Sequence, residues 1–170
     1  GYQTCGLKTD GTLACWGDNS YGQTTAPGGN FSRRLLTAGG THTCELQTGG
    51  TLACWGRNWY GESTPPAGTF TQVAGGYVHT CGLKTDGTLA CWGSDDYGQS
   101  TPPAGTFTQV ALGERHTCGL KTDGTLACWG GNDYGQSMAP AGTFTKVAAG
   151  AFHTCGLKTD GTLTCWGYDA

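Results

Sequence analysis

Charged residues and long apolar runs are both scarce in this chain of 170 residues. Only 12% of the residues are charged, about half the share that is usual for a soluble domain. No apolar run approaches the ~18 residues of a membrane-spanning helix. Basic runs are missing as well, and the net charge is −3. We therefore expect neither a membrane span nor a nucleic-acid partner.

Glycine and cysteine are abundant instead, with 32 and 10 residues. So much glycine argues against a long helical protein. A repeat explains both numbers, because the first cysteine of each repeat falls at Cys5, Cys44, Cys81, Cys118 and Cys155. Subtraction gives intervals of 39, 37, 37 and 37 residues. We treat residues 1–170 as a single domain with units of about 1–30, 31–66, 67–103, 104–140 and 141–170.

Residues 81–91 predict a β-hairpin. Asp86 and Gly87 form a turn signal between two alternating runs. A three-residue loop with Gly87 in the left-handed region sets Cys81 opposite Cys91, whereas a two-residue loop sets Cys81 opposite Trp92. We prefer the three-residue loop because it pairs the cysteines, and cross-strand partners about 4.5–5.5 Å apart lie within disulfide reach.

Every unit contains this pair of cysteines, so we expect five local disulfides: Cys5–Cys15, Cys44–Cys54, Cys81–Cys91, Cys118–Cys128 and Cys155–Cys165. Zinc is the alternative, but zinc-binding cysteines usually come two to four residues apart, and no such pair occurs. We expect no metal and no cofactor. Disulfides imply an oxidising compartment, so a secreted or cell-surface protein is expected.

A third strand is predicted at residues 70–74, with the sequence Phe-Thr-Gln-Val-Ala, and again from Phe107 and Phe144. A degenerate version begins at Phe31. Such a unit cannot bury its own apolar face, so neighbouring units must stack. The predicted fold is all-β and β-propeller-like, with five units of about 37 residues, each a disulfide-linked hairpin plus a third strand. The units form either a closed five-bladed ring or an open arc.

Residues 73–93, followed by Tyr-Gly-Gln at 97–99, resemble the repeat of the regulator-of-chromosome-condensation superfamily. His, Asp-Gly, Trp-Gly and Tyr-Gly-Gln recur in this order over nearly the whole chain. With its paired cysteines, the repeat is similar to secreted bacterial versions and to the extracellular repeats of Crinkly-type plant receptor kinases. The resemblance implies a propeller, usually seven-bladed, in which each repeat spans two neighbouring blades. The family's nuclear exchange-factor activity does not carry over, because the chain lacks basic character and its cysteines suggest export.

The number of repeats departs from that pattern. There are five cysteine hairpins but only four intervening strands of the Phe-x-x-Val type, and neither an initiator Met nor a signal peptide is present. We expect a processed product or a fragment. Three architectures stay open: a compact five-bladed ring, an arc that completes its missing strand with the next chain, and a piece of a larger propeller. The arc would make head-to-tail contacts, which produce rings or filaments.

The recurring polar and aromatic residues are expected to be structural. The histidines His42, His79, His116 and His153 share one repeat position. A ring of histidines could bind metal, but each lies two residues before a disulfide cysteine, so we expect hydrogen bonds to backbone between units. The tryptophans of Cys-Trp-Gly are expected to pack between units, and the aspartates of the hairpin turns to brace those turns.

The loops after Trp-Gly vary most, and variable loops on a rigid scaffold are where recognition usually occurs. Asn, Asp and Tyr suit sugar or protein contacts, although turn chemistry explains them equally well. Trp59 is the best single candidate because it occurs only once in the repeat pattern. Asn30 begins an N-glycosylation sequon. The candidate binding residues are Asn19, Tyr21, Asn58, Trp59, Tyr60, Asp95, Asp96, Tyr97, Asn132, Asp133 and Tyr134.

No Ser-His-Asp order, carboxylate pair or phosphate loop stands apart from the repeat, so we do not expect an enzyme. The leading hypothesis is a non-catalytic extracellular scaffold that binds protein partners or copies of itself. One alternative is a lectin-like protein that binds glycans through the variable loops. Another is a secreted enzyme inhibitor, since a secreted bacterial β-lactamase inhibitor of the resembling family binds its partner through one face of the ring.

Overall fold

The computed structural model describes residues 3–8, 12–27 and 31–169, without the side chains of Leu7 and of residues 31–35. Within these ranges the chain forms five antiparallel sheets, which we call units 1 to 5. Unit 1 has two strands, β1 (Gln3–Leu7) and β2 (Leu13–Gly17). The other units have three strands each: β3 (Phe31–Ala38), β4 (His42–Gln47) and β5 (Leu52–Gly56); β6 (Phe70–Gly75), β7 (His79–Lys84) and β8 (Leu89–Gly93); β9 (Phe107–Leu112), β10 (His116–Lys121) and β11 (Leu126–Gly130); β12 (Phe144–Ala149), β13 (His153–Lys158) and β14 (Leu163–Gly167).

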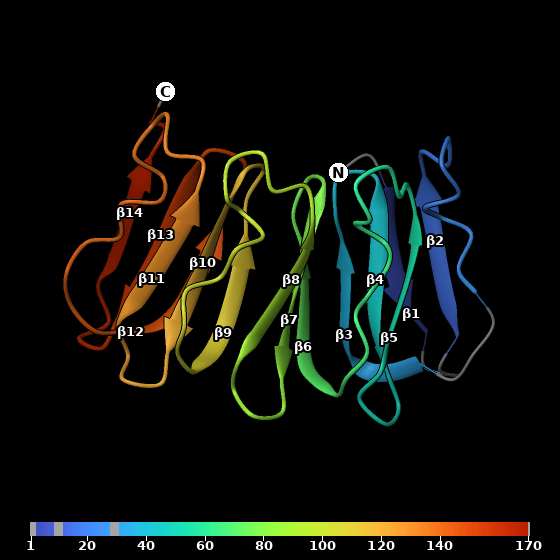
Figure 1. The fold of residues 1–170 in the computed structure, drawn as a ribbon, viewed down its shortest axis with the longest axis horizontal. Helices are drawn as coiled ribbons and strands as arrows, with labels where there is room; N and C mark the ends of the chain where they lie inside the picture. The colour runs from blue at the N-terminus through green and yellow to red at the C-terminus, as the bar shows by residue number, and fades with distance from the viewer. Residues whose placement is uncertain (1–2, 9–11, 28–30, 170) are drawn as a thin grey trace.

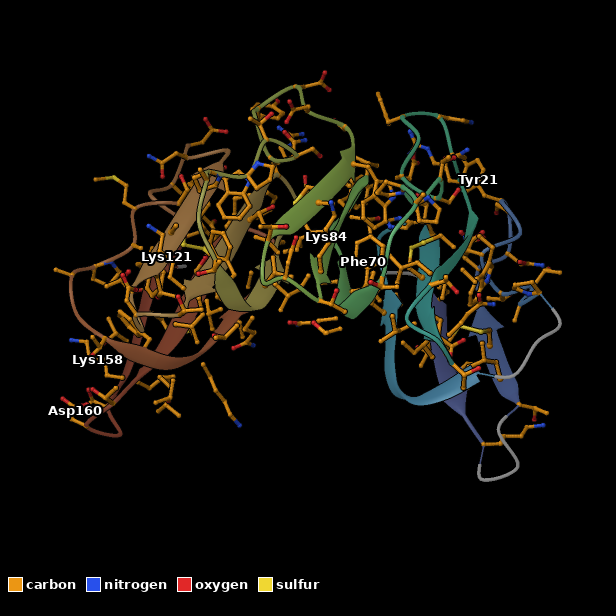
Figure 2. All side chains as sticks on the ribbon, turned by 60° about the horizontal axis from the view of Figure 1, so that its bottom comes forward. Tyr21, Phe70, Lys84, Lys121, Lys158 and Asp160 are labelled. Atoms are coloured by element: carbon orange, nitrogen blue, oxygen red, sulfur yellow. A yellow bond between two sulfur atoms is a disulfide. The ribbon has the colours of Figure 1, made fainter. Side chains whose placement is uncertain are left out.

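The sheets follow one another in chain order. Figure 1 shows β1 and β2 at one end of the row and β12, β13 and β14 at the other. Figure 2 shows the same row from another side as an arch, along which Lys84, Lys121 and Lys158 come from successive units. The terminal units lie far apart in both views, so each of them turns one sheet face outward.

The predicted hairpin is confirmed. Cys81 pairs with Cys91 and Leu83 with Leu89, as the three-residue loop requires. The Lys84 N–H donates to the Thr88 carbonyl oxygen at 2.9 Å, and Gly87 has φ of 84°, which favours glycine. All five predicted disulfides are formed, with Cα–Cα distances of 4.0–4.1 Å.

Alternate side chains of each interior middle strand face different neighbours. On β7, His79 points to unit 4, where its Nε2 lies 2.9 Å from Thr117 Oγ1. The next residue, Thr80, points to unit 2, where its Oγ1 lies 2.7 Å from His42 Nε2. His79 and Thr80 are both fully buried, so interior middle strands are covered on both faces.

The apolar core lies between units rather than inside them. Cys118 and Leu120 of unit 4 form one buried cluster with Phe144 and Val147 of unit 5. The expectation that units bury their apolar faces by stacking is therefore confirmed. Glycine is required in the middle strand at Gly82, because a Cβ there would lie 2.5 Å from Cδ1 of the Phe70 ring.

Candidate functional site

A histidine and a threonine join each interior unit to the next. The Thr117 hydroxyl donates its one proton to the Gln99 carbonyl oxygen at 3.0 Å. Since a hydroxyl has no second proton, Thr117 Oγ1 accepts the hydrogen bond from His79 Nε2. His79 Nε2 therefore carries a proton. Burial lowers the pKa of His79 to about 3, and those of His42 and His116 to about 4. For His42, His79 and His116 the predicted structural role between units is confirmed, but the partner is a threonine hydroxyl and not the predicted backbone group.

The recurring tryptophans also bond across the unit boundary. Trp129 Nε1 donates to the Gln99 carbonyl oxygen at 3.0 Å, the same oxygen that Thr117 uses. Trp55, Trp92 and Trp166 donate in the same way to Gln23, Glu62 and Gln136 of the unit before. The predicted packing of these tryptophans between units is confirmed.

The outward face of unit 5 repeats the histidine face of the interior units without a covering neighbour. We call its residues His153, Cys155, Leu163 and Cys165 the C-terminal end face. Leu163 is 68% exposed, and His153 is exposed although the other three histidines are fully buried. A hollow of about 600 Å³ lies there, lined by His153, both cysteines and Trp166.

At the interior boundary between units 4 and 5, a threonine occupies the position that corresponds to this hollow. Thr154 Oγ1 lies 2.8 Å from His116 Nε2 and 3.7 Å from Cys118 Sγ. The C-terminal end face therefore presents a histidine and a disulfide that, in an interior unit, contact the threonine of a following unit.

The outward face of unit 1 presents the threonine side of the same contact. We call Thr4 and Trp16 the N-terminal end face. Thr4 is exposed, whereas its equivalents Thr43, Thr80, Thr117 and Thr154 are fully buried. Trp16 is 57% exposed, whereas its equivalent Trp55 is 9% exposed. The two end faces thus carry complementary parts of one interior interface.

Five of the candidate binding residues are used inside their own loops, and one of them is Asp96, whose Oδ2 accepts from the Ser94 hydroxyl at 3.2 Å. Asn19 Oδ1 accepts from the Thr24 N–H at 2.9 Å, and Asp95 Oδ1 accepts from the Ser100 N–H at 2.7 Å. Asn58 and Asn132 accept equivalent bonds from backbone N–H groups five residues later. All eleven candidate residues are exposed, including those that make these loop bonds. Asn30 lies outside the described residues.

Unit 2 has an aromatic cluster that the sequence pattern only partly indicated. The Arg57 guanidinium carbon lies 3.9 Å from the Trp59 ring centroid, and the Tyr21 ring packs edge-on against Trp59 at 5.4 Å. Arg57 Nε also lies 3.6 Å from Oε1 of the buried Glu62. Trp59 remains 68% exposed despite these contacts.

In unit 1 the positions equivalent to Arg57 and Glu62 hold a different polar pair, Asp18 and Gln23. There Gln23 Nε2 donates to Asp18 Oδ2 at 3.0 Å. Both members of the pair change together, and both carry charge in unit 2. The sequence therefore does indicate the Arg57–Glu62 pair, because both positions of the polar pair change together in unit 2. The pair is overlooked when each loop position is considered separately.

The hairpin-turn aspartates Asp86, Asp123 and Asp160 are structural, as predicted, and Asp10 lies outside the described residues. Asp86 Oδ1 accepts from the Thr88 hydroxyl at 2.7 Å and from the Thr88 N–H at 2.8 Å. These hydrogen bonds, the hydroxyl first, lower the pKa of Asp86. Asp123 and Asp160 make the same pair of bonds.

Within the described parts of the chain, no group of three or more His, Cys, Asp or Glu side chains is arranged to hold a metal ion. The same residues contain no helix long and apolar enough to cross a membrane.

Stacked antiparallel sheets, one disulfide per unit and repeated contacts between units define a propeller-type β-repeat protein. The family model described as "Regulator of chromosome condensation (RCC1) repeat" matches residues 2–23, 70–99, 107–136 and 144–170, more than half of the chain. The chain belongs to this family. No curated protein sequence matches it.

Solved structures of receptor ectodomains are similar to this chain. The ectodomain of receptor kinase CR4 from Physcomitrella patens is 33% identical with a TM-score of 0.83, and the match covers 99% of this chain and 50% of that one. The CRINKLY WD40 ectodomain of Arabidopsis thaliana ACR4 is 29% identical with a TM-score of 0.78, covering 98% and 60%.

Prp20p from Saccharomyces cerevisiae shares the fold at 19% identity, with a TM-score of 0.83 and coverage of 98% and 56%. The chain thus spans half to 60% of the length of these structures. Its five disulfides and its similarity to receptor ectodomains indicate an extracellular or otherwise oxidising location.

Proposed function

We propose that this chain is a non-catalytic extracellular binding module that associates head to tail with a second copy through its two end faces. One observation carries the proposal: His153 is exposed at the C-terminal end face, whereas the same side chain is fully buried against a threonine wherever another unit follows. Thr4 is the corresponding exposed threonine at the other end. The occupant is a second copy because such a contact continues the interface already made between units.

The contact is heterologous, since one face carries the histidine and the other the threonine. Heterologous contacts generate rings when the rotation closes and filaments when it does not. Apolar burial supplies the driving force, and Leu163 and Trp16 are the large exposed side chains on the two faces.

Sedimentation velocity over a range of protein concentrations tests the proposal. The expected result is a mass that rises with concentration. Leu163→Arg on one face and Thr4→Arg on the other should each block one contact, and Lys121→Glu at the end of β10 is the control that leaves association intact. A mixture of the two blocked variants should stop at dimers, because each contributes its one intact face. A monomer at every concentration refutes head-to-tail association.

The cluster at Trp59 favours a second candidate function, which is glycan binding. An exposed tryptophan ring with one side against a guanidinium offers its remaining surface to the apolar face of a sugar ring. A glycan array with the wild-type chain, Trp59→Ala and Tyr97→Ala tests this candidate. Binding lost with Trp59→Ala and kept with Tyr97→Ala supports it, and an array without binding by the wild-type chain rejects it.

A further inference from the structure

A second hollow, of about 210 Å³, lies where loops of units 2, 3 and 4 meet. Each of these three units has a neighbouring unit on both sides, so the hollow does not depend on where the chain begins or ends. We call it the loop hollow. Its lining includes Arg57 and Tyr60 of unit 2, Tyr77, Asp96 and Tyr97 of unit 3, and Arg115 of unit 4.

The loop hollow brings together side chains that break the repeat. At the position of Tyr77 the other units have glycine, glutamate or alanine, and at that of Arg115 they have tyrosine, threonine, valine or phenylalanine. At the position of Arg57 they have aspartate, serine, glycine or tyrosine. Three residues that each occur once at their repeat position therefore line one hollow. A structural role common to all units does not account for them.

Arginine and tyrosine donors in the loop hollow are left without acceptors. Within the described residues, the Arg57 guanidinium has an ion pair with Glu62 and contacts to rings, but it donates no hydrogen bond. Its side chain is only 12% exposed, and buried polar groups are nearly always hydrogen-bonded. Arg115 Nη1 donates to the Tyr97 hydroxyl oxygen at 2.9 Å, which leaves the Tyr97 proton for another acceptor. An occupant rich in acceptors would satisfy both groups.

The walls of the loop hollow are aromatic and held in place. Tyr60, Tyr77 and Tyr97 are all exposed, so their rings are available to an occupant. The guanidinium carbon of Arg115 lies 4.9 Å from the Tyr97 ring centroid, and that of Arg57 lies 5.5 Å from the Tyr60 centroid. Side chain–backbone hydrogen bonds inside both loops fix them further. A site that is ordered in advance loses less entropy on binding.

We propose that the loop hollow binds a proline-rich segment of a partner protein in the polyproline II conformation. Such a segment has no internal hydrogen bonds, and each proline offers a carbonyl acceptor but no N–H. Aromatic-lined grooves are the sites that recognise these preformed segments. A hollow of about 210 Å³ is smaller than the ~300–1,000 Å³ of sites for drug-sized ligands, which suits one ring of an extended segment. Its lining residues come from units 2 to 4, so this binding is independent of head-to-tail association.

Carbohydrate is the alternative occupant. Every sugar hydroxyl brings a donor as well as an acceptor, so a bound sugar needs acceptors on the protein. Among the described lining residues only Asp96 has a carboxylate, and its Oδ2 already accepts from the Ser94 hydroxyl. The Gln99 amide oxygen accepts from the Tyr97 N–H. The excess of donors therefore favours proline carbonyls over sugar hydroxyls.

Calorimetric titration of the chain with decaproline tests the proposal. A Gly-Ser peptide of the same length is the control, because it is flexible where decaproline is preformed. The chain should bind decaproline at least about tenfold more tightly than the control peptide. Absence of decaproline binding, or equal binding of both peptides, overturns the proposal. A sugar that binds where decaproline does not, and is lost with Tyr60→Ala, would assign the loop hollow to carbohydrate and refute the peptide.

A matched pair of tyrosine variants locates the site. Tyr60 and Tyr134 hold the same loop position, and the backbone N–H of each donates to the side chain two residues later, a bond that alanine keeps. Tyr134 is also exposed but lies outside the lining of the loop hollow. Tyr60→Ala should weaken decaproline binding about tenfold, and Tyr134→Ala should change it less than about twofold. Equal losses would mean that the peptide adheres to exposed rings in general, which refutes the loop hollow as its site.

A double variant tests the guanidinium without leaving Glu62 buried and unpaired. Arg57→Asp with Glu62→Gln copies Asp18 and Gln23 of unit 1, which hydrogen-bond to each other at 3.0 Å, so the loop should fold. Decaproline binding should weaken at least about tenfold, because a donor is replaced by an acceptor. Urea unfolding of the variant checks its fold. Wild-type affinity in a folded double variant would refute donation from Arg57 to the peptide.

Discussion

Units 3 and 5 have almost the same hairpin and very different surroundings. Residues 79–93 and 153–167 differ only at Ala90 and Thr164. Even so, His79 is fully buried with its pKa lowered to about 3, whereas His153 is exposed. The hairpin sequence therefore determines the local geometry, and the neighbouring unit determines how deeply the side chains are buried. Stability in such an array resides largely in the interfaces between units.

The largest expected effect comes from a methyl group added where two units touch. A Cβ on Gly113 would lie 2.6 Å from the Gly150 carbonyl oxygen of the next unit and would also meet the His116 ring. Gly113→Ala should lower the free energy of unfolding by about 3 kcal/mol, because backbone must move.

The matched change Gly150→Ala should cost less than about 1 kcal/mol, since the nearest atoms to its Cβ belong to the exposed His153 ring, which can turn away. Urea unfolding of both variants measures the difference. Equal losses would contradict the view that neighbouring units set the cost.

The next effect comes from the threonine between units. Thr117→Val keeps the shape of the side chain but leaves buried His79 Nε2 without its hydrogen-bond acceptor. The expected loss of stability is about 2 kcal/mol, the cost of an unsatisfied buried polar group. Thr4→Val, at the exposed equivalent position, should change the free energy of unfolding by less than about 0.5 kcal/mol. A comparable loss in both variants would show that the hydroxyl matters within its own unit.

Much of this comparison could be predicted from the sequence. The period and the Asp-Gly turn were sufficient for the hairpin, and the turn register was sufficient for the five disulfides, because these depend on neighbours along the chain. Partners across unit boundaries were harder. His79 meets Thr117 38 residues away, and nothing in either local pattern indicates a hydroxyl rather than a backbone group. The burial of Glu45 was missed for the same reason.

Glu45 allows a comparison of unit 2 with the other units, where glycine occupies the same position. Its side chain is fully buried, and burial raises its pKa to about 7. Because the folded pKa is raised, the native state retains the proton more strongly. This contribution to stability is complete below pH 4.5 and is lost as the pH rises through about 7.

Glu45→Gln removes this titration. The variant should therefore gain about 1–2 kcal/mol over the wild-type chain at pH 8 and show no such gain at pH 4. Unfolding by urea at the two pH values measures the gain. A gain of the same size at both would mean that ionisation of Glu45 is not its cause.

The last expected effect is a change in the pH dependence of stability produced by one buried histidine. The folded pKa of His79 is depressed to about 3, so unfolding lets it take up a proton below about pH 6.5. Its stabilising contribution is present above pH 6.5 and is lost as the pH falls towards the folded pKa, at about 1.4 kcal/mol per pH unit. Glutamine suits the test variant, since Gln3 occupies this position in unit 1 and bonds to unit 2. Urea unfolding from pH 6.5 to 4.5 should give a shallower slope for His79→Gln than for the wild-type chain, by about one proton. The same slope in both would mean that His79 does not carry the depressed pKa that its burial implies.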